Sequence, residues 1–438
     1  MTFNSNKEKL IFYIIPVILF SLIPFFLITG PFLSDLSISI ISLTFLIYCF
    51  RKKNFSYFKN KYFIFFLIFW LYLIINSLIN NFNIHSFKIS FFYFRYGVFV
   101  IAAVALLETD SKFIKYFFYC IFICFVALVV DGFYQYFFGQ NIFGLKTAHH
   151  TRVSSFFGEE LILGSYLSRI WPIFFGLSIL IFKQKNLKFY LFILIFILSE
   201  ALIFLSGERA AFFYINLSAV FVIIFSQKLF RLRLITLLTS ILLLIIISSI
   251  NPTAKEKIFD QTLDQMNISL DQMNISQNED EDKDKEVNKI YIFSKEHTEH
   301  YISAYKIFLD NKFIGIGVKN FRNICKDERY FTNTYSCANH PHNTYIQILA
   351  ETGIVGFLFL IFTLIYFCKY VIKHFVLKFK KKSYFNDFEI CILSGIAIYL
   401  WPFIPTGNIF NNWLNIAMIL NFPLLIWSRK LMNYKNFN

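Results

Sequence analysis

The chain has 438 residues, of which 57% are hydrophobic and 21% aromatic. A soluble core does not need so many apolar residues, so the long apolar runs predict a helical membrane protein with many spans. The formal charge of +15 could indicate a nucleic-acid partner, but its distribution argues against one. Residues 251–344 hold 12 of the 42 basic and 15 of the 27 acidic residues, so the positive surplus lies in short segments between the apolar runs.

Twelve apolar runs each approach the roughly 20 residues that a helix needs to cross a bilayer. The expected fold is therefore all-α and polytopic, with about twelve transmembrane helices. The first run is long enough to span, so we expect no cleavable signal peptide. The predicted spans are residues 10–29, 32–50, 62–80, 88–107, 114–137, 161–182, 189–206, 210–226, 234–250, 345–368, 388–405 and 410–428.

The connections between these spans alternate in charge. Every second one is basic, and together these hold 24 Lys and Arg: residues 7–9, 51–61, 112–115, 183–188, 228–233, 369–382 and 429–435. Because Lys and Arg are enriched in cytoplasmic connections, both termini are expected in the cytoplasm. The predicted organisation is nine spans in residues 1–250, a large outward-facing loop at 251–344, and three spans in residues 345–438.

The large loop divides into two parts. Residues 251–296 contain a tandem seven-residue duplication and an acidic run, which indicate a flexible insert. Residues 297–344 include a stretch with helical spacing of apolar residues and are expected to fold. Cys325 and Cys337 both lie in this second part. If it is extracytoplasmic they could form a disulfide, and two free thiols are the alternative.

The most informative stretch is residues 339–356, where polar residues run straight into an apolar helix. Thr344 and Gln347 are spaced as a capping box, which predicts a helix beginning at Thr344. His342 would then lie just outside a helix N-terminus, where N–H groups and the macrodipole favour an anion. A titratable base at such a place indicates chemistry on a phosphate-bearing lipid. His340 and His342 alone are a weak metal motif, and no metal or other cofactor is expected.

Two arginines lie on the outer side, which is otherwise poor in Lys and Arg. Arg152 is in a short loop, and Arg209 is in a turn so short that it must lie at or below the membrane surface. An Arg there is costly unless it meets a carboxylate, a phosphate or water. A phosphate clamp is one interpretation, since the guanidinium fork suits pyrophosphate oxygens. An ion pair between Arg209 and Glu208, or snorkelling, is the other.

Several polar residues fall inside the predicted spans, and each is a functional candidate by default. The residues are Arg95, Asp131, Gln135, Arg169 and Glu200. Arg95, Asp131 and Arg169 lie nearer the span ends, where structural pairing or snorkelling is the favoured interpretation.

Four motifs in this order resemble the O-antigen ligase/polymerase superfamily. His342-Asn343, nine residues, Gly353, two residues and Gly356 resemble its His motif. Two segments resemble its arginine motifs: Arg152 to Gly158 and Ser206 to Arg209. Tyr301 to Phe321 resembles its large-loop helix, which ends in a Gly-x-Gly-x-x-Asn-Phe turn. One position departs: His297 stands where the family usually has an Arg.

The resemblance implies a multi-pass enzyme of the bacterial inner membrane with its active face in the periplasm. It would transfer a glycan from undecaprenyl pyrophosphate to an acceptor, without metal and with inversion at the sugar. His342 would be the general base, because an unperturbed pKa near ~6.5 suits that role. Arg152 and Arg209 would bind the pyrophosphate. The secondary candidates are His297, His300, Arg322, His340, Asn343 and Glu351, with Arg329 a further option for a third phosphate contact.

Several alternatives stay open at the level of sequence. A ligase would use lipid A core as acceptor, a polymerase would extend another lipid-linked repeat, and protein glycosylation is a further option. A twelve-span transporter would show two related halves, which the sequence lacks. A catalytically silent scaffold for polysaccharide export is the third class. The expected partners are the lipid-linked donor, the acceptor and the bilayer, with no nucleic acid.

Overall fold

The computed structural model describes residues 1–80, 83–148, 152–182, 187–228, 230–250, 255–265 and 294–435. Within these ranges the regular structure is helical. The β features in the described residues are two isolated bridges, Gln140 to Lys146 and Ala148 to Arg152. The predicted all-α class is confirmed.

Among the described residues, eight helical segments are long and apolar enough to cross a membrane. Four of them are single helices: Pro31–Lys52 (α3), Lys61–Ile79 (α4), Leu163–Ile181 (α8) and Thr344–Phe379 (α17). Phe230–Ser249 lies within α11 (Phe230–Ile250), and Ser111–Phe138 ends in α7 (Ile114–Phe138). The other two join two helices each: Asn6–Thr29 contains α1 (Asn6–Lys9) and α2 (Ile15–Thr29), and Ile84–Thr109 contains α5 (Ile84–Phe92) and α6 (Phe94–Thr109). The other predicted spans coincide with shorter helices: α9 (Leu187–Leu205), α10 (Arg209–Phe225), α18 (Asp387–Leu400), α19 (Asn412–Ile419) and α20 (Asn421–Lys435).

The helices are apolar on their outer faces as well as inside. Phe20, Phe99 and Phe117 are fully buried, whereas Leu43 on α3 and Leu242 on α11 are 59% and 60% exposed. A helix that is apolar on all sides is typical of a membrane span, because its outer face meets lipid instead of water. The fold is thus that of a polytopic membrane protein.

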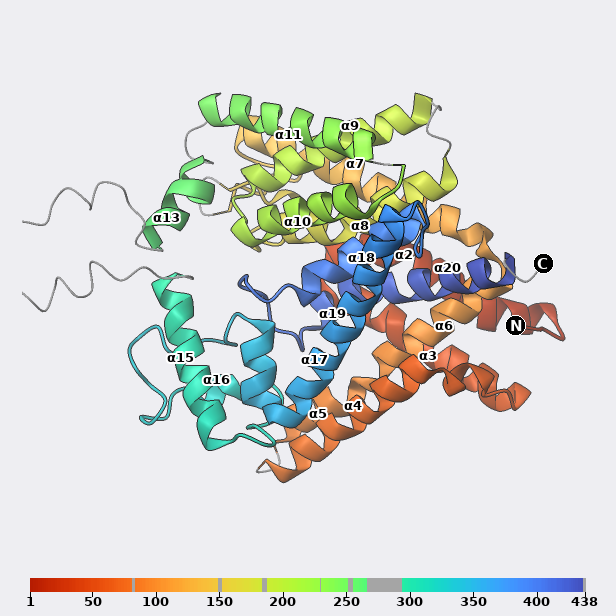
Figure 1. Cartoon of the computed structure of the whole chain (residues 1–438), viewed down its shortest axis with the longest axis horizontal. Helices are drawn as coiled ribbons and strands as arrows, with labels where there is room; N and C mark the ends of the chain where they lie inside the picture. The colour runs from red at the N-terminus through yellow and green to blue at the C-terminus, as the bar shows by residue number, and fades with distance from the viewer. Residues whose placement is uncertain are drawn as a thin grey trace, which may run out of the picture.

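The two ends of the molecule differ in what they contain. Figure 1 shows both chain termini at one end, on the right of the view. At the other end lie α13 (Gln261–Gln265), α15 (Lys295–Asp310) and α16 (Phe321–Ile324), which belong to the long polar segment. The termini and this polar segment therefore lie on opposite sides of the helical body.

The expected flexible insert, residues 251–296, falls largely outside the described residues. Residues 251–254 and 266–293 are not described. Inside the insert, residues 256–260 form a short π-helix that leads into α13.

Arg233 does not belong with the exposed basic residues of a connection, where the sequence analysis counted it. Its side chain is 1% exposed and forms an ion pair with Glu200 at 2.5 Å. Its guanidinium also lies 4.5 Å from the ring centroid of Trp171. The pair explains Glu200, because each buried charge neutralises the other.

A break in α17 determines where the polar segment docks. Gly353 has φ 62° and ψ −169°, which are not helical angles. Four backbone groups around the break bond to residues 312–317. The carbonyls of residues 350–351 accept from the N–H groups of residues 316–317 at 3.2 and 2.9 Å. The N–H groups of residues 354–355 donate to the carbonyls of residues 312–313 at 2.8 and 3.3 Å.

The glycines of two motifs meet at this junction. A Cβ on Gly353 would overlap the carbonyl of Phe313, and a Cβ on Gly315 would lie 2.5 Å from the Gly353 nitrogen. Both positions also have positive φ, 62° and 76°. The backbones can approach this closely only because neither residue has a side chain. From α4, Asn76 donates to the Ile314 carbonyl at 2.6 Å. The segment after α15 is thereby fixed on α17.

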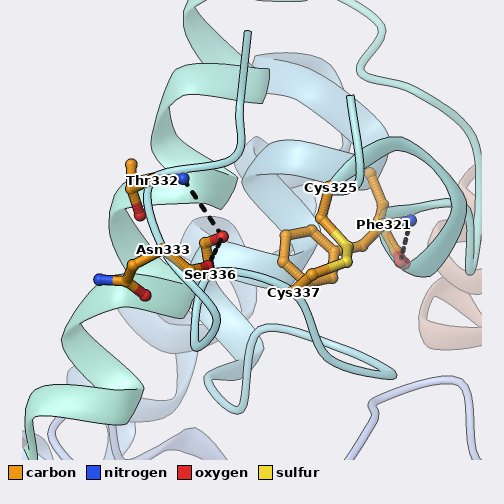
Figure 2. The surroundings of a disulfide bond; sticks show 7 residues. Phe321, Cys325, Thr332, Asn333, Ser336 and Cys337 are labelled. Atoms are coloured by element: carbon orange, nitrogen blue, oxygen red, sulfur yellow. Dashed lines mark hydrogen bonds between the residues drawn. A yellow bond between two sulfur atoms is a disulfide. The ribbon is translucent and has the colours of Figure 1, made fainter. Parts of the chain in front are cut away.

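The rest of the polar segment is closed by the disulfide between Cys325 and Cys337, whose Cα atoms are 5.2 Å apart. Figure 2 shows the bond beside the ring of Phe321, which is fully buried. Ser336 supports the same loop by accepting a hydrogen bond from the Thr332 N–H at 3.2 Å. The pairing that the sequence left open is therefore present in the structure. It ties the end of α16 to the irregular chain that leads to His340 and His342.

Candidate active site

The site begins at the N-terminus of α17. The helix begins at Thr344, as predicted, but the capping box is wrong: the cap is Asn343, whose side-chain oxygen accepts from the N–H of residues 345 and 346 at 2.9 and 3.2 Å. Gln347 donates to Glu351 instead, at 3.1 Å. The reason is that an Asn one residue earlier already satisfies the free N–H groups. His342 precedes this cap with φ 56°, in the left-handed region.

A loop between α18 and α19, residues 401–411, holds the histidines in place. The N–H of Thr406 donates to the His342 carbonyl at 2.7 Å. The carbonyl of Thr406 accepts from Nε2 of His340 at 3.2 Å. The hydroxyl of Thr406 lies 3.0 Å from the hydroxyl of Thr344. Asn343 donates to the Pro402 carbonyl at 2.8 Å. The predicted spans leave a connection at residues 406–409, around which Pro and Gly residues interrupt the apolar run, but nothing in the sequence indicated that it would contact the histidines.

Three imidazoles gather around that of His342, which makes a cluster of four. The ring centroid of His340 lies 4.1 Å from that of His342, and the centroids of His297 and His300, both on α15, lie 5.3 Å from it. The sequence singled out all four residues but did not predict that they meet. Within the described ranges, no group of three or more His, Cys, Asp or Glu is arranged to hold a metal ion.

The environment lowers the basicity of this histidine cluster. Burial, and then the neighbouring His300, lower the pKa of His342 to about 4. Burial and the neighbouring His342 lower the pKa of His297 to about 4 and that of His340 to about 3. Burial also lowers the pKa of His300, so the four rings are neutral at neutral pH. The unperturbed value assumed from the sequence does not hold for the unliganded protein.

The loop that carries Arg152 is organised by two polar residues of α7. Gln135 accepts from the N–H groups of Ser154 and Ser155 at 2.8 and 2.7 Å, and it donates to the carbonyls of residues 145–146 at 3.1 and 3.2 Å. Asp131 accepts from the Ser155 hydroxyl at 2.5 Å. Both polar residues inside this predicted span therefore shape the Arg152 loop.

Arg152 packs against the turn that carries Arg209. Its Nε donates to the Ser206 carbonyl at 2.8 Å, and a Cβ on Gly207 would lie 3.1 Å from the same nitrogen. The carboxylate of Glu208 accepts from the N–H groups of Gly164 and Ser165 at 2.5 and 2.8 Å. Glu208 thus satisfies the N-terminus of α8, and burial raises its pKa to about 7.

Electrostatic interactions connect the arginine motifs to the histidines. Burial lowers the pKa of Arg152, and the positive charge of Arg209 lowers it further. The charge of Arg209 also contributes to the lowered pKa of His297, whose ring contacts His342. The structure therefore brings Arg152, Arg209 and the histidine cluster into one electrostatic neighbourhood.

The remaining candidates fall into two groups. The charge of Arg322 helps to lower the pKa of His340, after burial and His342, so Arg322 lies near the cluster. Arg329 forms an exposed ion pair with Asp327 at 2.7 Å, so its guanidinium already has a carboxylate partner. Glu351 is fully buried and accepts from the Phe321 N–H at 3.4 Å, at the first residue of α16. Glu351 thus links α17 to the N-terminus of α16.

Arg95 and Arg169 are the two arginines inside predicted spans, and they differ in their partners. Arg95 forms an ion pair with Asp35 at 2.8 Å, so structural pairing explains it. Arg169 stacks on Tyr214 and Tyr399, with ring centroids 4.7 and 5.6 Å from its guanidinium carbon. The sequence contained no signal that would have grouped these two tyrosines with Arg169, since they lie on different helices.

Fold and site define a polytopic helical membrane protein with buried polar residues gathered at the end opposite its termini. The family model described as O-Antigen ligase matches residues 190–361. This match supports the resemblance to the O-antigen ligase superfamily, whose members are of the glycosyl-transfer type and handle lipid-linked glycans. It covers Arg209, His342 and Glu351, and it ends before the loop at 401–411. None of the curated proteins compared with the chain matches it.

Proposed function

We propose that this protein transfers an undecaprenyl-pyrophosphate-linked glycan to an acceptor hydroxyl at the periplasmic face of the inner membrane, as an O-antigen ligase does. The observation that carries the proposal is the meeting of two motifs distant in sequence. The charge of Arg209 acts on His297, whose ring centroid lies 5.3 Å from that of His342. Transfer from a pyrophosphate needs a base that accepts the proton of the acceptor hydroxyl and a nearby cation that stabilises the leaving pyrophosphate.

In this mechanism the acceptor hydroxyl attacks the anomeric carbon of the donor sugar and gives its proton to the imidazole of His342. The bond between that carbon and the pyrophosphate oxygen breaks, and undecaprenyl pyrophosphate leaves from the opposite face. Attack opposite the leaving group inverts the sugar and needs no metal in this scheme. Arg152 and Arg209 stabilise the charge that develops on the leaving oxygen, with Arg322 as the candidate for a third cation.

The low pKa of His342 is compatible with this role. A pyrophosphate bound beside the cluster brings negative charge next to the ring, and a nearby opposite charge raises the pKa of an imidazole. The donor would therefore move His342 from about 4 toward neutrality and make it a stronger base. Basicity would then develop only when the substrate is in place.

The proposed topology has twelve spans, both termini in the cytoplasm and residues 251–344 in the periplasm. The basic connections predict this orientation. The separation of the termini from α15 and α16 in Figure 1 supports it. Helices shorter than a bilayer crossing, such as α18 with 14 residues, would complete their spans with the adjoining irregular chain.

The test is His342→Ala, expressed in a strain that lacks the gene, with cell-surface glycan as the readout. We expect loss of surface glycan at normal protein abundance. His85→Ala is the matched control, because His85 is an exposed histidine of α5 outside the cluster. Normal glycan in the His342 variant would refute the proposal. The intermediate that accumulates separates two reactions: polymer on the carrier indicates a ligase, and a single lipid-linked repeat indicates a polymerase.

A further inference from the structure

A small cavity lies beside the loop at 401–411, and Arg169 lines it. The other lining residues come from α10, α17, α18, α19 and the 401–411 loop: Tyr214, Thr344, Tyr399, Thr406, Gly407, Ile409 and their neighbours. Arg169 lies on α8 and is 4% exposed. A guanidinium at this depth is costly unless something compensates its charge.

The described residues give Arg169 little of that compensation. Its Nη1 donates to the Ser165 carbonyl at 3.4 Å, and no carboxylate in the described part of the chain forms an ion pair with it. Its Nε is buried without a hydrogen-bond partner among those residues, and the hydroxyl of Tyr399 is in the same condition. Stacking on two tyrosine rings offsets part of the charge but supplies no anionic oxygen.

Arg233 is a buried arginine of the same protein whose charge is neutralised by a carboxylate, and it serves as a comparison for Arg169. It also stacks on an aromatic ring, at 4.5 Å, but it has the Glu200 carboxylate at 2.5 Å. Arg169 has the stacking without the carboxylate. Arg169 therefore lacks an anionic oxygen as hydrogen-bond partner. An anion in the cavity could reach both Arg169 and the Tyr399 hydroxyl, because both residues line it.

The cavity adjoins the proposed active site directly. Thr344 and Thr406 line it, and the N–H of Thr406 bonds to the His342 carbonyl at 2.7 Å. Tyr214, which stacks on Arg169, donates to the Pro405 carbonyl in the same loop at 3.4 Å. From α19, Leu414 and Met418 add apolar lining, and Asn415 lines the cavity beside them. A cavity with a guanidinium and hydroxyls on one hand and apolar side chains on the other suits an anionic group attached to a lipid chain.

We propose that Arg169 and the Tyr399 hydroxyl form a binding subsite for an anionic oxygen of the substrate, separate from Arg152 and Arg209, beside the loop at 401–411. This inference rests on the proposed function for the identity of the substrate. The anion is a phosphate oxygen of the lipid-linked donor or a carboxylate of an acidic sugar. Both would make charge-assisted hydrogen bonds to the guanidinium.

The experiment measures binding to the purified full-length chain in nanodiscs, without turnover. The probes are farnesyl pyrophosphate, farnesol as its neutral match, and glucuronate. Tyr399→Phe removes a single buried hydroxyl beside Arg169, so the melting temperature without probe should change little. Its affinity for the anionic probe should fall about tenfold, the value of one hydrogen bond to a charged group. Arg169→Gln should weaken binding about a hundredfold.

Arg233→Gln is the matched control, since it also removes a buried stacked arginine. It should lower the melting temperature and leave the affinity of the folded protein unchanged. If only farnesyl pyrophosphate responds to the substitutions, the anion is a phosphate of the donor; if only glucuronate responds, it is an acidic sugar. Wild-type affinity in Tyr399→Phe, or equal binding of farnesol, would overturn the proposal. If Arg169→Gln does not fold, the Tyr399 variant decides.

Failure of this inference is distinguishable from failure of the proposed function. Wild-type binding in the Tyr399 and Arg169 variants, together with loss of surface glycan in His342→Ala, removes the subsite and leaves the glycosyl transfer standing. Normal glycan in His342→Ala removes the transfer, whatever the binding data show.

Discussion

Replacing Gly353 with Ala tests whether the break in α17 holds the polar segment in place. The angles φ 62° and ψ −169° are reserved for glycine, and another residue there costs about 1–3 kcal/mol. The new Cβ would also overlap the Phe313 carbonyl, so residues 312–317 must withdraw. Loss of two of the four backbone hydrogen bonds adds about 1–3 kcal/mol. The total, about 2–6 kcal/mol, is a large fraction of the stability of a typical protein.

The assay compares Gly353→Ala with Gly144→Ala by thermal unfolding in nanodiscs and by surface glycan. Gly144 also has positive φ, 82°, but a Cβ there meets nothing within 4 Å. Its substitution therefore costs only the backbone strain of about 1–2 kcal/mol. We expect the Gly353 variant to melt at a clearly lower temperature and to lose glycan, because α15 leaves α17. Equal melting temperatures and equal glycan in the two variants would refute this reasoning.

Three further predictions follow from the site. Gln135→Ala removes the partner of four backbone groups in the Arg152 loop, at about 1–3 kcal/mol for each one left unsatisfied, and surface glycan should fall; normal glycan would contradict its role. A Cys325→Ser, Cys337→Ser double variant should lose about 3 kcal/mol of loop restraint and expose residues 297–344 to added protease, and wild-type cleavage rates would argue against this. Lowering the pH from 6.5 toward 4 should lower the melting temperature, because unfolded histidines bind protons that folded His297 and His342 exclude; a His297→Gln, His342→Gln double variant with the same pH slope would count against it.

Local patterns predicted the helices well. A long apolar run next to basic residues indicates a helix whichever neighbours it has. Every predicted span overlaps at least one helix, and 88–107 and 410–428 fall on two helices each. The glycine spacing after His342 also indicated the superfamily. Local patterns failed for the N-cap of α17, because two adjacent residues can fill that position. The cap is Asn343 and not Thr344, since the Asn343 side chain accepts from the free N–H groups.

The sequence by itself singled out the candidate residues, because Lys and Arg are rare in the short outward-facing connections and His342 directly precedes a predicted helix start. Only the tertiary structure decided how they combine. His297 and His342 meet because the break at Gly353 docks residues 312–317 on α17. Arg169 meets Tyr214 and Tyr399 because three helices pack together. These contacts join residues far apart in sequence, and no local periodicity records which distant segments will pack.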